Sequence, residues 1–253
     1  METSTVTEIR YRTFGSGGPK VVLLHGGMQT SANFTRLATA LASTFTVYVP
    51  DRRRQGLRSE ISDLAAVLDE TGAGNVFGLS SGAVVALHGA LELPRIERLA
   101  LYEPPLRYGG FDPLGWRPRF EKELAKGHTA RAMVTVSKGT GDFPYVPRAA
   151  LVPFVRLWMR SDPRVRELVP TMRGDAAVVE QAGGPLDRYA AVTAETLLLG
   201  GERSPAYLIR VLNGLEPVLP NVRRVTLDGV GHVAADNSGQ PERVAEELRK
   251  FFR

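Results

Sequence analysis

The chain has 253 residues, of which 43% are hydrophobic, enough for one sizeable core with an insertion but too little for two large independent domains. It contains no cysteine, which excludes disulfides, thiolate catalysis and zinc–thiolate sites. The formal net charge is +5, and no run of about 18 apolar residues occurs, so we expect no transmembrane span and no membrane partner.

The surplus of positive charge lies in the middle of the chain. Residues 104–190 hold 14 Lys and Arg against 9 Asp and Glu, whereas the rest of the chain is neutral. Most of these charges are arginines scattered among Pro and Gly, without the aromatic-interleaved stripe or motif of a nucleic-acid-binding protein. We therefore expect a solvated basic face and no nucleic-acid partner. Mild attraction of anionic substrates or carrier proteins is the functional alternative.

Short apolar runs alternate with helical patterns in the first hundred residues. The runs are typical of strands buried in a parallel sheet, and the helices carry apolar residues at helical spacing. The predicted strands cover residues 7–14, 21–24, 45–49, 75–77 and 96–102. The predicted helices cover residues 31–42, a segment with Ser59 as its N-cap, and residues 83–87. Asp51 and Arg52, which follow a strand, are interpreted as a structural ion pair.

The pattern changes between residues 105 and 189. Proline is frequent, strand-like runs are few, and short amphipathic segments occur at 120–126, 152–159 and 165–169, which predicts a helical insertion. The alternation then resumes, with strands at 196–199 and 222–227, a helix at 205–215 and a last helix with Pro241 near its first position. Strands alternating with helices predict a parallel sheet covered on both faces, which binds ligands outside the carboxyl ends of its strands.

The most informative motif is Gly78-Leu79-Ser80-Ser81-Gly82, between a strand-like and a helix-like run. G-x-S-x-G in this context is typical of a nucleophile elbow, whose glycines let the strand and the helix approach closely. We expect Ser80 to be the nucleophile, because it holds the central position that Ser81 does not. A plain turn serine is the alternative.

A serine nucleophile needs a general base and an oxyanion hole. Of the four histidines, His232 is the best candidate, because it follows a strand, lies in a Gly-rich loop and precedes the last helix. We expect His25 to brace the His-Gly-Gly turn instead. The two oxyanion donors are expected to be the amides of Ser81 and Gly27, with Met28 as a less favoured choice.

The whole chain resembles the α/β-hydrolase superfamily, in its serine-nucleophile group with a helical cap. The resemblance is carried, in order, by VVLLHGG (21–27), VPDRRRQG (49–56), GNVFGLSSGAVVAL (74–87), LALYEPP (99–105), LLLGGERSP (197–205) and DGVGH (228–232). It implies an α/β fold with a mostly parallel, doubly wound sheet and an inserted helical cap. The implied division is a core of residues 1–104 and 190–253 and a cap of residues 105–189. Most members begin with two additional strands, whereas this N-terminus has room for a single one.

The catalytic acid departs from the commonest pattern of that family. The usual aspartate of a G-x-x-x-D sequence is replaced, because Gly200 is followed four residues later by Ser204. Glu202 lies two residues too early. Some relatives place the acid at the end of the strand after the elbow helix, where this chain has Glu103. We expect Glu103 to orient His232, with Glu202, a water, Ser204 or no acid at all as alternatives.

The leading hypothesis is a serine hydrolase that cleaves an ester, thioester or related acyl substrate through a Ser-His-acid triad and an acyl-enzyme. We expect no cofactor and no metal, a small-molecule acyl substrate and a cytoplasmic location; homo-oligomerisation stays open. A lyase, cyclase or acyl transferase on the same scaffold, favoured by the displaced acid, and a non-catalytic ligand-binding protein are the alternatives. The cap is expected to roof the acyl pocket, and its large aromatic residues are candidates for pocket walls or ordinary core: Phe111, Trp116, Phe143, Phe154 and Trp158.

Overall fold

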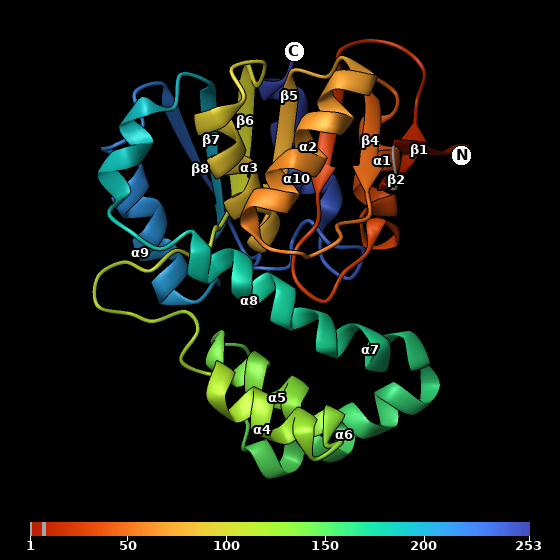
Figure 1. Cartoon of the computed structure of the whole chain (residues 1–253), viewed down its shortest axis with the longest axis vertical. Coiled ribbons are helices and arrows are strands. Elements are labelled where there is room, and N and C mark those ends of the chain that lie inside the picture. Colours follow the sequence, from red (N-terminus) through yellow and green to blue (C-terminus); the bar gives the residue numbers. More distant parts are fainter. Residues whose placement is uncertain (1, 7–8) are drawn as a thin grey trace.

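The computed structural model describes residues 2–6 and 9–253. The described residues form one eight-stranded sheet with the strand order β1-β2-β4-β3-β5-β6-β7-β8 (Figure 1). β2 pairs antiparallel with β1 and with β4, and the pairs from β4 to β8 are parallel. The strands are β1 (Glu2–Val6), β2 (Ile9–Phe14), β3 (Lys20–Leu24), β4 (Thr46–Pro50), β5 (Asn75–Leu79), β6 (Arg98–Tyr102), β7 (Glu195–Gly201) and β8 (Val222–Leu227).

Helices cover both faces of this sheet. Alternate residues of one strand divide between two apolar clusters: Val22 and Leu24 of β3 join one, and Val21 and Leu23 join the other. The first cluster includes apolar residues of α2 (Leu57–Thr71), α3 (Ser81–Glu92) and α9 (Ala206–Leu215). The second includes those of α1 (Thr35–Leu41), which follows η1 (Ser31–Phe34), and of α10 (Pro241–Phe251). The predicted doubly wound α/β fold is confirmed.

Two local predictions near the N-terminus are wrong. The sequence predicted a single strand over 7–14, but the chain forms both β1 and β2, because its first residues pair back along β2 as a hairpin. Residues 7 and 8 lie outside the described part. Ser59 is not an N-cap, since α2 begins at Leu57 and is preceded by Gly56, whose φ of 98° favours glycine.

The segment between β6 and β7 contains only helices among its regular elements. They are α4 (Arg117–Ala125), α5 (Thr129–Gly139), α6 (Arg148–Ser161), α7 (Pro163–Leu168), η2 (Val169–Thr171), α8 (Met172–Gln181) and η3 (Leu186–Ala191). Residues 105–189 of this segment are called the cap below. In Figure 1, α8 runs along the edge of the sheet domain, and α4, α5 and α6 lie beyond it. α5 and α8 were missed from the sequence. Across the described chain, no helix is both long and apolar enough to cross a bilayer.

Candidate active site

Ser80 lies in the tight turn between β5 and α3. Its φ of 54° and ψ of −122° are rare for a residue with a side chain, and such backbone strain is typical of functional positions. The flanking glycines are sterically required. A Cβ on Gly78 would lie 2.5 Å from the carbonyl oxygen of Gly82, and one on Gly82 would lie 2.4 Å from the carbonyl oxygen of Leu24. The turn therefore has the geometry of a nucleophile elbow.

Glu103 and His232 are brought together from residues 129 positions apart. The Nδ1 atom of His232 lies 2.7 Å from Oε2 of Glu103, whose side chain is fully buried. The other carboxylate oxygen accepts a hydrogen bond of 2.7 Å from the amide of Gly201. A proton on Nδ1 donates to this carboxylate and leaves Nε2 free to act as a base.

The ends of β6 and β7 make room for this carboxylate. Gly200 has no side chain where a Cβ would lie 3.1 Å from Oε1 of Glu103. The hydroxyl of Tyr102 donates to the carbonyl oxygen of Gly231 at 2.8 Å, which ties the loop of His232 to the end of β6. The carboxyl ends of β6, β7 and β8 thus hold Glu103 and His232 together.

The other acid candidates have different surroundings. Glu202 accepts a hydrogen bond of 2.7 Å from the amide of Gly229 and makes none with His232. Ser204, at the position of the usual aspartate, is buried, and its hydroxyl has no hydrogen-bond partner among the described residues. The geometry therefore brings Glu103, and neither alternative, into hydrogen-bonding contact with His232.

Ser80 and His232 line one small cavity of about 50 Å³ together with Gly27 and Ser81. Ser81 is the first residue of α3, where the N–H has no partner within the helix. The amide of Gly26 is engaged by the side chain of Gln29 at 2.8 Å, whereas the amide of Gly27 has no acceptor within the described chain. The helix N-terminus adds positive potential at this point. Gly27 and Ser81 are thus placed to hold an oxyanion in the cavity.

Two of the three remaining histidines, His25 and His88, have buried structural surroundings. His25 is fully buried beside Arg54 and Arg52, and its burial lowers its pKa to about 3. His88 contacts the hydroxyl of Tyr189 at 2.9 Å, and burial lowers its pKa to about 4. Both rings are therefore neutral at pH 7. The sequence interpretation of His25 as a brace agrees with its Nε2 atom lying 3.3 Å from the amide of Arg52.

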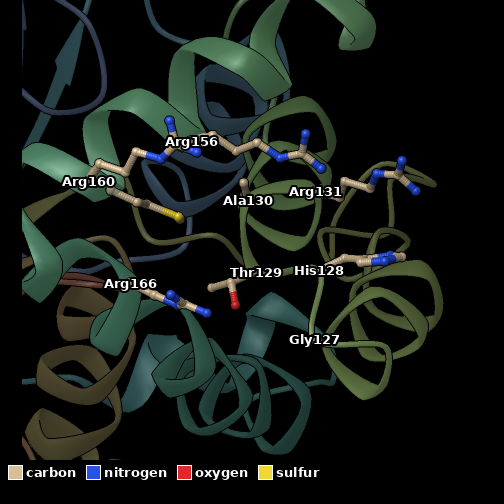
Figure 2. Close-up of a pocket in the computed structure, with 9 residues that line it drawn as sticks. Gly127, His128, Thr129, Ala130, Arg131, Arg156, Arg160 and Arg166 are labelled. Atoms are coloured by element: carbon tan, nitrogen blue, oxygen red, sulfur yellow. The ribbon is translucent and has the colours of Figure 1, made fainter.

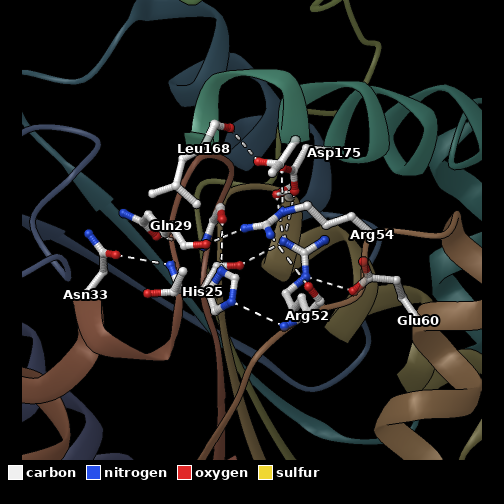
Figure 3. Close-up of polar contacts among 12 residues, drawn as sticks. His25, Gln29, Asn33, Arg52, Arg54, Glu60, Leu168 and Asp175 are labelled. Carbon is white, nitrogen blue, oxygen red and sulfur yellow. Dashed lines mark hydrogen bonds and ion pairs between the residues drawn. The ribbon is translucent and has the colours of Figure 1, made fainter. Parts of the chain in front are cut away.

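A buried network of charges joins the cap to this site (Figure 3). Oδ1 of Asp175 in α8 accepts hydrogen bonds from the hydroxyl of Ser81 at 2.7 Å and from Arg52 at 3.0 Å. Oδ2 accepts from Arg54 at 2.9 Å. Burial alone would raise the pKa of Asp175, but the guanidinium groups of Arg52 and Arg54 outweigh it and lower that pKa. Arg52 also pairs with Glu60 at 2.7 Å.

This network corrects one sequence interpretation and adds one residue that was missed. Arg52 does not pair with Asp51, which instead accepts a hydrogen bond of 2.7 Å from the amide of Ser31. Asp175 was not recognised as part of the site. The available signal was a carboxylate on the buried face of α8, next to Ala176 and one turn from Val179.

The cavity walls come mostly from the cap. Trp116, which was a predicted wall, lines the cavity, and so do the following apolar residues: Pro105, Pro113, Leu114, Met172, Ala176 and Val179. Phe111 stacks on Tyr207 with ring centroids 4.3 Å apart. Phe143, Phe154 and Trp158 are neither walls nor core, since each is exposed to solvent. Among the residues described, no group of three or more His, Asp or Glu is arranged to hold a metal ion.

Comparison with known proteins places this architecture in a family. The model of the Alpha/beta hydrolase family matches residues 21–247. The chain belongs to this family. The resemblance noted from the sequence is thereby confirmed, and the chain is a hydrolase of the alpha/beta type.

Individual relatives cover nearly the whole chain. A pimeloyl-[acyl-carrier protein] methyl ester esterase from Xanthomonas campestris pv. campestris (strain B100) is 26% identical over 250 residues, which span 92% of this chain and 95% of that protein. An alpha/beta hydrolase from Sphaerobacter thermophilus DSM 20745 is 31% identical, covers both chains completely and has a TM-score of 0.81. The enol-lactonase from Burkholderia xenovorans LB400, at 20% identity, 99% of both chains and a TM-score of 0.72, shares the fold.

Proposed function

We propose that this hydrolase is a cofactor-free serine esterase with Ser80 as nucleophile, His232 as general base and Glu103 as the acid of its triad. The amides of Gly27 and Ser81 form the oxyanion hole. The observation that carries the proposal is the 2.7 Å contact between His232 and the buried Glu103, with Ser80 on the same cavity. A carboxylate in contact with an imidazole, together with a strained serine on the same cavity, supports the roles of a catalytic triad.

The proposed reaction follows from these positions. The Oγ atom of Ser80 attacks the acyl carbon while its proton passes to Nε2 of His232, and Glu103 stabilises the imidazolium through Nδ1–H. The carbonyl oxygen becomes negative and receives the N–H groups of Gly27 and Ser81. Collapse of this intermediate expels the alcohol, which takes the proton from His232. Water then attacks the acyl-enzyme by the same steps and releases the acid.

The substrate class is set by the cap. Its side chains give the cavity apolar walls, and the cavity is small, so we propose a small ester with an apolar acyl group. The ester chemistry is supported by the printed activity of the Xanthomonas campestris relative, a methyl ester esterase. We further propose that residues 105–189 act as one lid-forming unit over the core, since their helices occupy a single insertion between β6 and β7.

Fluorophosphonate labelling tests the triad. Intact mass is measured over time for the native chain and for Ser80→Ala, Glu103→Gln and Glu202→Gln. We expect no adduct with the first variant, clear slowing with the second and native rates with the third, which is the matched control because Glu202 contacts Gly229 and not His232. Equal labelling of the native chain and Glu103→Gln would remove Glu103 from the triad, and labelling of Ser80→Ala would remove Ser80.

The non-hydrolytic alternative rested on a displaced acid. The contact of Glu103 with His232 at 2.7 Å supports a complete triad in spite of that displacement, so we favour hydrolysis over a lyase, cyclase or transferase. Hydrolysis of an ester in ¹⁸O-labelled water separates these reactions. Esterase chemistry incorporates the label into the released acid, and a product without label would overturn it.

A further inference from the structure

The cap carries a second cavity, of about 210 Å³, that the esterase chemistry does not use. Residues 127–131, at the start of α5, line it together with Arg156 and Arg160 of α6 and Arg166 of α7. Figure 2 shows Arg156 and Arg160 on one side of this space and Arg166 with Thr129 on the other. Four arginines from three helices therefore line one hollow.

These four arginines differ from the other arginines of the cap. Arg131, Arg156, Arg160 and Arg166 are exposed, and within the described chain the side chain of none of them makes a hydrogen bond or an ion pair. Every other arginine of the cap has a carboxylate, hydroxyl or carbonyl partner: Arg107, Arg117, Arg119, Arg148, Arg164, Arg173 and Arg188. Like charges that gather around one hollow without counter-ions repel each other, and an anion between them relieves that repulsion.

Backbone donors in the same hollow add to this charge. The amides of Thr129, Ala130 and Arg131 open α5, so they have no acceptor within the helix, and no side chain caps them. The amide of His128 is engaged by the carbonyl oxygen of Glu123 at 2.9 Å. Free N–H groups at a helix N-terminus bind tetrahedral oxyanions, and arginine forks match the same oxygens in pairs.

We propose that this hollow, formed by α5, α6 and α7, is a binding site for a phosphate-type oxyanion. A phosphate monoester fits the donor set better than a single carboxylate, because its three terminal oxygens meet donors from different directions. The group comes either as a free phosphate compound or as the headgroup of an anionic lipid. A lipid headgroup is supported by the apolar surface nearby on the same helix, since Phe154, Leu157 and Trp158 of α6 are exposed around a shallow hollow.

Calorimetry with inorganic phosphate tests the site on the full chain, against sodium chloride of equal ionic strength as the blank. We expect one saturable site in the native chain and binding weakened by about tenfold or more in Arg156→Gln/Arg160→Gln. The matched control is Arg58→Gln/Arg210→Gln, two exposed arginines of the core helices α2 and α9 that make no ion pair among described residues. Its binding should equal that of the native chain.

Each result decides the proposal. No heat beyond the chloride blank, or equal weakening in the control pair, would overturn it. Circular dichroism shows whether Arg156→Gln/Arg160→Gln folds, and Arg131→Gln/Arg166→Gln replaces it if it does not. Sedimentation with phosphatidylcholine vesicles, with and without phosphatidic acid, then identifies the source. Vesicle binding that is lost in both the arginine pair and Phe154→Ser/Leu157→Ser assigns a lipid headgroup, and phosphate binding without vesicle binding assigns a free phosphate compound.

Discussion

The carboxyl end of the sheet and the cap contribute different groups to the candidate active site. All proposed reacting groups lie in loops at the carboxyl ends of parallel strands, after β3, β5, β6 and β8. The cap contributes apolar walls and a single carboxylate, Asp175, which contacts Ser81 and not the proposed base. Three positive-φ residues with side chains, Met28, Ser80 and Glu103, lie in those core loops. Backbone strain is thus concentrated where the chemistry is proposed.

The difference shows that residues at the strand ends are positioned more precisely than residues in the cap. A parallel ladder fixes where a strand ends, so the residue one position past it is held by a hydrogen bond to the next strand. The amide of Ser80 donates to the carbonyl oxygen of Tyr102, and that of Glu103 to the carbonyl oxygen of Leu199. The cap helices α4, α5 and α6 pack on one another, whereas α8 packs on α2 and α3 and η3 packs on α3 and α9. Substitutions at the carboxyl ends of the strands should therefore change the chemical step, and those in the cap should change stability or substrate choice.

The largest effect is expected from Ser80→Ala. Loss of a serine nucleophile costs on the order of 10⁶-fold in kcat, or about 8 kcal/mol of transition-state stabilisation. Steady-state hydrolysis of a small ester measures it, with the unfolding midpoint as the control for folding. A kcat within tenfold of the native value would contradict the proposal that the reacting groups lie at the carboxyl ends of the strands, because the nucleophile would then lie elsewhere.

Glu103→Gln should come second. An amide in place of the carboxylate favours the wrong tautomer of His232 and costs about 10⁴-fold in kcat, with KM little changed. Glu202→Gln provides the comparison, because Glu202 accepts a hydrogen bond from the amide of Gly229 and makes none with His232. Equal kcat losses in the two variants would mean that Glu103, after β6, matters no more for catalysis than Glu202, after β7, in spite of its contact with His232.

Asp175→Asn tests the ion pairs that link the cap to the core. It leaves Arg52 and Arg54 without their shared carboxylate in a buried position, which should lower the free energy of unfolding by about 3 kcal/mol. Urea unfolding measures this loss. Asp162→Asn, at an exposed pair in the cap, should lower the free energy of unfolding far less. If Asp175→Asn is as mild as that control, the cap is not held by this network.

The smallest effect per residue is a dependence of stability on pH. The pKa values of His25 and His88, about 3 and about 4, lie below the ordinary 6.5, so the unfolded chain binds protons first as pH falls below 6.5. The free energy of unfolding therefore decreases as pH falls below 6.5, by about 2 kcal/mol per histidine at pH 5. The lowered pKa of Asp175 adds nothing in this window, because its contribution is lost only below its ordinary value of 3.8. His88→Gln should halve the slope of unfolding free energy between pH 5 and 6.5; an unchanged slope would refute this assignment.

The sequence predicted most of the core edge and little of the cap. The elbow was predictable because Gly78 and Gly82 are required locally. Glu103 was predicted from the family resemblance, because some relatives place the acid at the end of the strand after the elbow helix. Asp175 was not predictable in the same way, since its contact with Ser81 joins residues 94 positions apart and no local rule sets how α8 docks. The β1–β2 hairpin was missed for a similar reason, because a short polar strand carries no strong periodicity.

The proposed placement of the acid at the end of β6 has a consequence for mutational tolerance. The loop after β7, which holds the aspartate in the commonest pattern of the family, here has a buried Ser204 hydroxyl without a partner among the described residues. With Glu103 as the proposed acid, that loop need not supply a catalytic residue, whereas a side chain at Gly200 would crowd Oε1 of Glu103. Homologues in which position 103 is not acidic should accordingly regain an aspartate at position 204.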